Sequence, residues 1–284
     1  MQLIRTNATL LSALQAQRQQ GKRIGFVPTM GALHQGHISL IRISQQQTDF
    51  TVCSLFVNPT QFNDKKDLEN YPRTEASDCE ALAAVNCDLV YIPTVEEIYP
   101  PDLISPHFDF GELATVMEGK MRPGHFAGMA QVVHRLLDLV NPDALFMGQK
   151  DLQQFTIVKR MLQLMNSPID LVCCPIVREN DGLAMSSRNV RLTTTERSLA
   201  PIIYSTLKSL KDPNYRLHFA TPTAYIEHAT KALNETNGMS VEYVSIVDTT
   251  TLQACDNWTN SAEKACCIAV RLGAIRLIDN VLFK

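Results

Sequence analysis

Short apolar runs alternate with longer amphipathic segments along the first 177 residues. The apolar runs predict β-strands, and the segments with apolar residues at helical spacing predict helices. The predicted strands are Ile24–Val27, which stops at Pro28, Phe50–Val57, Leu89–Ile92, Ala144–Met147 and Ile169–Cys174. The predicted helices are Asn7–Gln20, Gly36–Gln46, Thr74–Val85, Met129–Leu139 and Asp151–Leu164, with a loop-rich stretch between Pro100 and Pro123. This alternation predicts an α/β fold, a parallel sheet with helices on both faces.

The order of elements changes after about Val177. A long helix is predicted to begin near Thr193, where Thr193 and Glu196 form a capping-box pattern, and Pro201 is expected to kink it. The elements that follow are a helix at Thr223–Leu233 and strands at Val241–Val247, Ala265–Arg271 and Arg276–Val281. We therefore expect two domains, residues 1–177 and residues 178–284, of which the second is a small α+β domain.

The composition favours a globular protein with a small-molecule partner. Apolar residues make up 45% and charged residues 19% of the chain, which suits a packed core and argues against disorder. The net charge of −3 gives no reason to expect a polybasic surface for nucleic acid or a membrane. No run resembles a secretory signal or is long enough to span a bilayer, so we expect a cytoplasmic protein.

The eight cysteines form no C-x-x-C pair, which argues against a zinc ribbon or a thioredoxin-like site. The doublets at 173–174 and 266–267 lie in apolar, strand-like runs. Buried free thiols in a reducing cytosol are the interpretation that we adopt.

The string PTMGALHQGH, from Pro28 to His37, carries the strongest chemical signal. It follows a predicted strand and begins a helix, and in open parallel sheets ligands bind at the carboxyl ends of the strands. The N–H groups of a first helical turn suit a phosphate, and Gly31 and Gly36 would let the backbone approach it. An imidazolium at His34 or His37 could then stabilise a departing pyrophosphate. Two exposed loop histidines are the alternative for this pair alone, and no cysteine or carboxylate cluster accompanies it to favour zinc.

The segment FVNPTQF, from Phe56 to Phe62, ends the second predicted strand and exposes Asn58 and Gln61. Neutral amides suit the hydroxyls and carboxylate of a small polar acid. A proline turn whose amides satisfy the backbone explains the same residues equally well. Further along, KMRPGHF (Lys120–Phe126) is either a mobile segment near phosphates or a solvated loop.

The segment GQKDLQQ, from Gly148 to Gln154, repeats the strand–turn–helix pattern. Gly148 would let the backbone pass close to a nucleotide, and Lys150 is a mobile cation suited to phosphate. Asp151 is expected to cap the following helix.

A longer hydrophilic segment, VRENDGLAMSSRNVRL, runs from Val177 to Leu192 between the two predicted domains. The hydroxyls of Ser186 and Ser187 can bind phosphates, and Arg188 offers a planar fork for them. The segment is therefore either a loop that closes over a nucleotide or a polar interdomain turn.

These motifs together resemble one known family. H-x-G-H in a strand–turn–helix setting resembles the HIGH signature of the nucleotidyltransferase superfamily, and the string PTMGALHQGHISL is similar to the pantothenate synthetases, or pantoate–β-alanine ligases. MSSR, Met185–Arg188, resembles the KMSKS-type loop of the superfamily. The tail RLGAIRLIDN, Arg271–Asn280, resembles the C-terminal strand of the family, and we expect its role to be structural.

The resemblance implies a Rossmann-like domain for nucleotide and pantoate, a C-terminal lid and an AMP-forming ligase that joins pantoate to β-alanine through pantoyl adenylate. His37, His34, Lys150 and Arg188 are the expected catalytic residues, with His37 acting as a proton donor or as a stabiliser of charge. The expected ATP site comprises Met30, Gly31, Ala32, Leu33, His34, Gln35, Gly36, His37, Gly148, Gln149, Lys150, Asp151, Val177, Met185, Ser186, Ser187 and Arg188.

The resemblance also implies contacts to the other substrates. Gln61 is expected to bind pantoate and β-alanine, Gln154 to bind pantoate, and Asn58 to assist them. Mg²⁺ should accompany ATP, although no residue is singled out as its ligand; Asp78 and Asp88 are among the available carboxylates. A homodimer is expected, without nucleic-acid or membrane partners.

Two other functions compete with the ligase. A cytidylyltransferase of the same superfamily would join a nucleotide to a phosphorylated substrate, but the amide-rich segments favour a carboxylic acid. A catalytically silent nucleotide-binding protein would be expected to have lost a motif cation, and none is missing from this sequence.

Overall fold

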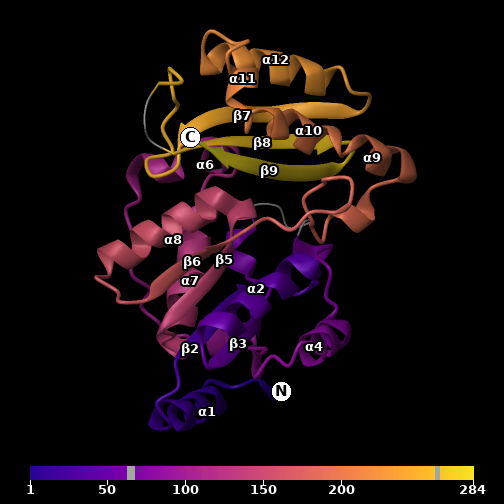
Figure 1. Cartoon of the computed structure of the whole chain (residues 1–284). Coiled ribbons are helices and arrows are strands. Elements are labelled where there is room, and N and C mark those ends of the chain that lie inside the picture. The colour runs from indigo at the N-terminus through magenta and orange to yellow at the C-terminus, as the bar shows by residue number, and fades with distance from the viewer. Residues whose placement is uncertain (63–67, 260–262) are drawn as a thin grey trace.

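The computed structural model describes residues 1–62, 68–259 and 263–284. They form two β-sheets with associated helices, which we call the N-terminal part and the C-terminal part (Figure 1). In Figure 1 the C-terminal part, in orange and yellow, lies above the N-terminal part. The structure therefore contains both the predicted parallel sheet with helices on its faces and the predicted smaller α+β arrangement that follows it.

The N-terminal sheet has six parallel strands in the order β1-β4-β3-β2-β5-β6. Its strands are β1 (Gln2–Ile4), β2 (Ile24–Thr29), β3 (Phe50–Leu55), β4 (Leu89–Tyr91), β5 (Ala144–Gly148) and β6 (Asp170–Cys174). The order reverses between β2 and β5, since β3 and β4 extend the sheet to one side of β2 and β6 extends it beyond β5. Such a reversal opens a crevice beyond the carboxyl ends of the two central strands.

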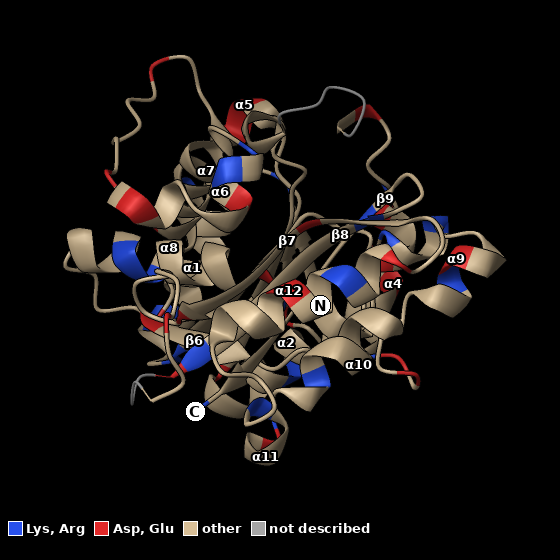
Figure 2. Ribbon diagram, turned by 90° about the horizontal axis from the view of Figure 1, so that it is seen from above, with Lys and Arg blue, Asp and Glu red and all other residues tan. Residues whose placement is uncertain are grey.

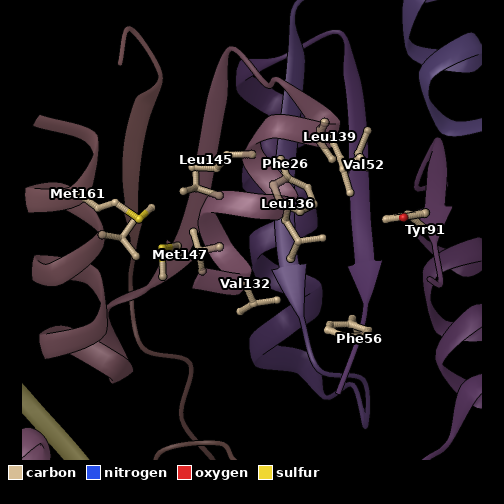
Figure 3. Close-up of a cluster of buried hydrophobic side chains, with 14 of the residues drawn as sticks. Phe26, Val52, Phe56, Tyr91, Val132, Leu136, Leu139, Leu145, Met147 and Met161 are labelled. Carbon is tan, nitrogen blue, oxygen red and sulfur yellow. The ribbon is translucent and has the colours of Figure 1, made fainter. Parts of the chain in front are cut away.

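The alternating side chains of the strands enter two separate cores. Phe26, Val52 and Leu145 face α1 (Asn7–Gln19), α7 (His125–Val140) and α8 (Leu152–Leu164), as the packing of α7 against the strands in Figure 3 illustrates. The neighbouring residues Val27, Cys53 and Phe146 face α2 (Gln35–Gln47) and α4 (Glu75–Ala84). Because both faces of the central strands are covered, β2, β3, β4 and β5 are mostly buried and apolar, which is the pattern that predicted them.

Three predictions for the N-terminal part need correction. The strand before the histidine motif does not stop at Pro28 but pairs in parallel with β3 as far as Thr29. The sheet also has an edge strand, β1, which the sequence did not reveal because it has three residues with only one partly covered. Finally, α7 begins at His125 rather than Met129, because Gly124 adopts a left-handed conformation that starts the helix.

The stretch between Pro100 and Pro123 is not loop throughout. It contains a 3₁₀ helix, η2 (Gly111–Ala114), and α6 (Met117–Met121), while the short helix α5 (Val95–Ile98) precedes it. Gln153 on α8 holds α6 in place, since its side chain donates to the carbonyls of Leu113 and Val116 and accepts from the Glu118 N–H group. These short helices depend on tertiary contacts that local periodicity does not encode.

The C-terminal part contains an antiparallel sheet in the order β7-β8-β9. Its elements are η4 (Asn189–Arg191), α9 (Thr194–Leu199), α10 (Ile202–Ser209), α11 (Pro213–Arg216), α12 (Pro222–Asn234), β7 (Met239–Asp248), β8 (Lys264–Leu272) and β9 (Ile275–Phe283). The predicted capping box of Thr193 and Glu196 is present. The single long helix is wrong, because the chain forms two helices on either side of Pro201.

All eight cysteines are free, but the expectation that the thiols are buried holds only in part. Cys173 is exposed although its neighbour Cys174 is buried. Basic and acidic residues are intermingled over both parts of the molecule (Figure 2). Within the described residues, no helix has both the length and the apolar character needed to cross a bilayer.

Candidate active site

Two strand-to-helix turns meet at the point where the sheet order reverses. The histidine turn, residues 30–34, joins β2 to α2, and the lysine turn, residues 148–151, joins β5 to α8. Between them lies a cleft of about 210 Å³, which continues toward the C-terminal part as a second cleft of about 470 Å³. Lys150, Asp151 and Gln154 line both clefts. A ligand extending from one cleft to the other would therefore pass the start of α8.

The two motif histidines cap the helix that they begin. His34 stands at the N-cap of α2, where its Nδ1 accepts from the Gly36 N–H group (3.1 Å). His37 reaches back, and its Nδ1 accepts from the His34 N–H group (3.3 Å). Because Nδ1 is the acceptor in both rings, the neutral form of each carries its proton on Nε2. A side chain at position 36 would collide with the His34 ring, 2.7 Å from its nearest atom, so this arrangement requires glycine there.

Both histidines are neutral at pH 7, contrary to the imidazolium that we expected from the sequence. Burial lowers the pKa of His37 to about 3, with further contributions from His34 and Lys150. Burial also lowers the pKa of His34 to about 4, and the charge of Lys150 acts in the same direction. Each ring can still donate a hydrogen bond from Nε2, and the positive charge of the site then comes from Lys150 and Arg188.

The histidine turn is braced by Asp78 on α4, which is only 4% exposed. Its carboxylate accepts from the N–H groups of Ala32 (2.9 Å) and Leu33 (2.8 Å) and from the Thr74 hydroxyl (3.1 Å). The backbone amides near Gly31 that we expected to bind phosphate are therefore already engaged. Asp78 and Asp88 are poor candidates for Mg²⁺ for the same reason, since Asp88 accepts from the Thr51 N–H group.

The lysine turn forms a 3₁₀ helix, η3 (Gln149–Asp151), that carries the half-buried Lys150 to the junction of the clefts. Asp151 stands at the N-cap of α8, but its side chain makes no capping hydrogen bond, so its predicted capping role is wrong. In the described part of the chain no carboxylate lies within ion-pair distance of the Lys150 ammonium group. This lysine is thus available to an anionic ligand.

The amide side chains differ in their freedom to bind a ligand. Asn58 is 1% exposed; its Nδ2 donates to Gln61 Oε1 and to the Gly128 carbonyl, and its Oδ1 accepts from Tyr99. Asn58 therefore builds the turn, as the structural interpretation of FVNPTQF had it. Gln61 donates to the weak acceptor Met30 Sδ, and Gln154 lines both clefts, so these two amides can turn toward a polar acid.

The segment KMRPGHF has a buried end, which contacts Gln61 through His125, and an exposed beginning at Lys120. His125 Nδ1 donates to the Gln61 carbonyl (2.9 Å), and Arg122 donates to His125 Nε2 (3.2 Å). Lys120 is exposed and lines neither of the two clefts. The buried end of this segment thus supports Gln61.

The segment that contains MSSR begins with a short hairpin closed by the bridge between Arg178 and Ala184. The Arg178 guanidinium packs 3.7 Å from the centre of the Tyr204 ring and forms two hydrogen bonds with the buried Asp279 of β9 (2.6 and 2.9 Å). Both residues lie in segments noted in the sequence, but their pairing could not be predicted because they are 101 residues apart. Their ion pair fixes the hairpin to the C-terminal sheet.

A second ionic contact joins the two parts at α6. Glu118 accepts two hydrogen bonds from Arg276 (2.7 and 2.8 Å) and one from the Tyr243 hydroxyl (2.6 Å). Burial opposes ionisation of Glu118, but Arg276 and Tyr243 outweigh it, so its pKa lies below the ordinary value. Arg276 lies in the RLGAIRLIDN segment, but the sequence did not indicate this contact, because Glu118 is 158 residues away.

Most of the predicted site residues come together at the two clefts. The smaller cleft is lined by Met30, His34, Gly36, His37, Asn58, Gln61, Gly148, Lys150, Asp151, Gln154, Val177 and Met185. Ser186 and Arg188 line the larger one. Among the described residues, six that we assigned to the ATP site line neither of these clefts: Gly31, Ala32, Leu33, Gln35, Gln149 and Ser187.

A resident metal site is not apparent in residues 1–62, 68–259 and 263–284, where no group of three or more His, Cys, Asp or Glu side chains could hold an ion. Divalent magnesium is commonly bound through substrate phosphates with few protein ligands.

The family model, the curated relatives and the solved structures that resemble this chain all point to one family. The family model described as pantoate-beta-alanine ligase matches residues 2–282. A pantothenate synthetase of Porphyromonas gingivalis is 48% identical over 288 residues, covering 100% of both chains. Among solved structures, pantothenate synthetase from Thermus thermophilus aligns with a TM-score of 0.90 at 37% identity, over 99% of each chain. The Francisella tularensis pantoate-beta-alanine ligase, complexed with beta-gamma ATP and beta-alanine, aligns with a TM-score of 0.82 at 34% identity, over 99% of this chain and 97% of that one.

Proposed function

This chain belongs to the pantoate–β-alanine ligase family, and we propose that it joins pantoate to β-alanine at the expense of ATP, through pantoyl adenylate. The observation that carries the proposal is the meeting of the histidine turn, the lysine turn and the MSSR segment at two connected clefts. The products are pantothenate, AMP and pyrophosphate.

In the first step the pantoate carboxylate attacks the α-phosphorus of ATP and pyrophosphate leaves. We assign Gln61 and Gln154 to pantoate, because their amides line the smaller cleft beside the histidines. Lys150 and Arg188 offset the negative charge of the phosphates, and His34 and His37 donate from Nε2. With a pKa of about 3, His37 is neutral and stabilises charge as a hydrogen-bond donor more readily than it delivers a proton as an acid.

In the second step the amine of β-alanine attacks the acyl carbon of the adenylate, and AMP leaves as the amide forms. A free acyl adenylate would react with water, so a site that excludes water protects it. We propose that residues 1–177 form the nucleotide- and pantoate-binding domain and residues 178–284 a lid over it. The larger cleft, which is lined from both parts, supports this division.

Magnesium, the assembly state and the location belong to the same proposal. We assign Mg²⁺ to the ATP substrate, as MgATP, because the described residues offer no acidic cluster. A cytoplasmic location is supported by eight free thiols, which suit a reducing compartment. The resemblance to this family suggests a homodimer, and analytical ultracentrifugation would give its mass.

The test is product analysis with ATP, Mg²⁺ and pantoate, with and without β-alanine. We expect pyrophosphate in an amount near that of the enzyme when β-alanine is absent, and continuous formation of pantothenate and AMP when it is present. Cytidine triphosphate with a phosphorylated alcohol serves as the comparison for a cytidylyltransferase. Turnover with that pair, and none with pantoate, would contradict the proposal.

A further inference from the structure

Two adjacent residues of β9, Asp279 and Asn280, contact both cationic segments of the site from the opposite sheet. They are 4% and 2% exposed, so neither is a surface side chain. Asn280 Nδ2 donates to the carbonyls of Gln149 (2.9 Å) and Lys150 (3.0 Å), and its Oδ1 accepts from Gln149 Nε2 (3.0 Å). The Asn280 carboxamide therefore holds the lysine turn with three hydrogen bonds.

Asp279 fixes the orientation of its neighbour and reaches the second segment. Its Oδ1 accepts from the Asn280 N–H group (2.7 Å), and both of its carboxylate oxygens accept from Arg178. Arg178 also donates to the Asn280 carbonyl (3.3 Å) and begins the hairpin that leads to MSSR. Asp279 and Asn280 thus link the turn that carries Lys150 to the segment that carries Arg188.

The lysine turn depends on this contact because it has little support of its own. Its only helical element, η3, has three residues, and the side chain of Asp151 makes no capping hydrogen bond. Gly148 leaves open space where a Cβ would be, so side-chain packing does not restrain that end of the turn. The carboxamide of Asn280 compensates, since a buried amide that satisfies two carbonyls fixes their direction and the direction of the side chain between them.

We propose that Asn280, held by Asp279 and Arg178, is a positioning residue that places Lys150 against the phosphates of ATP. The inference rests on the proposed function, which assigns Lys150 to ATP. It gives the C-terminal strand a part in adenylation, beyond the structural role that its sequence suggested. Any movement of the C-terminal part that carries β9 with it would also shift the turn or break its three hydrogen bonds.

The experiment is a double-mutant cycle between Asn280→Leu and Lys150→Ala. Leucine is similar in shape to asparagine but neither donates nor accepts, and Asn280→Ala serves as a second variant if Asn280→Leu does not fold. The dissociation constant of a non-hydrolysable ATP analogue is measured by calorimetry, and pyrophosphate release is measured with saturating pantoate. KM values for pantoate and β-alanine show whether a loss is confined to ATP.

A matched control is Val247→Ala. Val247 lies on β7 in an apolar cluster that includes Met117 and Leu152 of the N-terminal part, and it lines neither cleft. The substitution should weaken the contact between the two parts and lower the melting temperature, with ATP affinity within about twofold of the wild type. The control distinguishes a general weakening of the contact between the two parts from the specific loss of the Asn280 hydrogen bonds to the lysine turn.

We expect Asn280→Leu to weaken ATP binding and to slow pyrophosphate release by about tenfold each, with the other KM values within about twofold; tenfold corresponds to about 1.4 kcal/mol. In the Lys150→Ala background the same substitution should change ATP binding by less than about twofold. Equal losses with and without Lys150, or losses no larger than those of Val247→Ala, would overturn the inference. If Lys150→Ala itself binds ATP normally, the assignment of Lys150 to ATP is wrong instead.

Discussion

The histidine turn and the lysine turn occupy equivalent places in the fold but are held in different ways. Each joins the carboxyl end of a central parallel strand to the helix that follows it. The histidine turn is braced within the N-terminal part, by its own capping box and by Asp78. The lysine turn is uncapped and is held by Asn280 from the C-terminal part.

The two turns differ in charge as they do in support. The histidines are buried and neutral, so they offer directed hydrogen-bond donors in a preformed position. Lys150 is a half-buried cation whose backbone carbonyl accepts a hydrogen bond from Asn280 of the other sheet. The geometry of the histidine turn therefore depends on contacts within the N-terminal part, whereas that of the lysine turn depends on β9 as well.

The largest expected effect comes from removing the cation of the lysine turn. Lys150→Ala should lower the rate of pyrophosphate release by about 10²–10³-fold, the range found when a group that stabilises developing charge is removed. Single-turnover measurements with pantoate would show this directly. Lys159→Ala, which removes an exposed lysine from the following helix, should leave the rate unchanged. A loss of the same size in both variants would mean that overall charge matters and the turn does not.

A smaller effect is expected from removing the brace of the histidine turn. Asp78→Ala leaves the N–H groups of Ala32 and Leu33 without their acceptor and should lower the free energy of unfolding by about 2–4 kcal/mol. Glu75→Ala is the matched control on the same helix, because its ion pair with Arg5 is half exposed and worth at most about 1 kcal/mol. Urea denaturation measures both variants. Similar losses would show that the brace is unimportant.

The smallest expected effect is the dependence of stability on pH. The pKa values of His34 and His37, at about 4 and about 3, lie below the value of about 6.5 expected in the unfolded chain. Their contribution to stability is therefore present above pH 6.5 and is lost as the pH falls toward 4. His34→Asn, which keeps a good N-cap residue, should make the melting temperature fall less steeply in this window.

Nitrogen-resolved NMR provides an independent check of the same point. Both rings should remain Nε2–H tautomers between pH 8 and pH 5, since their Nδ1 atoms accept hydrogen bonds from the backbone. A histidine of this pair that titrates near pH 6.5 would contradict the neutral site.

The parts of the fold that the sequence predicted are those fixed by local patterns. The buried strands and amphipathic helices of the N-terminal part were found within a few residues, because apolar runs and helical spacing reflect burial directly. The break between two helices at Pro201 was predicted only as a kink in one helix. Helix α6 was not predicted, because its position depends on a contact with Gln153 from another helix.

The same distinction applies to the site. The histidines could be predicted because the residues that position them lie within one ten-residue motif. Asp78 is 46 residues from Ala32, and Asn280 is 130 residues from Lys150, so nothing in a local motif indicates either contact. The neutral state of the histidines could not be predicted either, since it results from burial by the folded chain.

The central claim is that the carboxylate of pantoate attacks the α-phosphorus of ATP at these two turns. It is tested most directly with pantoate labelled with ¹⁸O in its carboxylate, in a complete reaction with ATP, Mg²⁺ and β-alanine, followed by mass analysis of the products. The account predicts one labelled oxygen in AMP and none in pyrophosphate, because the bridging oxygen of the adenylate leaves with AMP when the amide forms. Unlabelled AMP, or label in pyrophosphate, would contradict it.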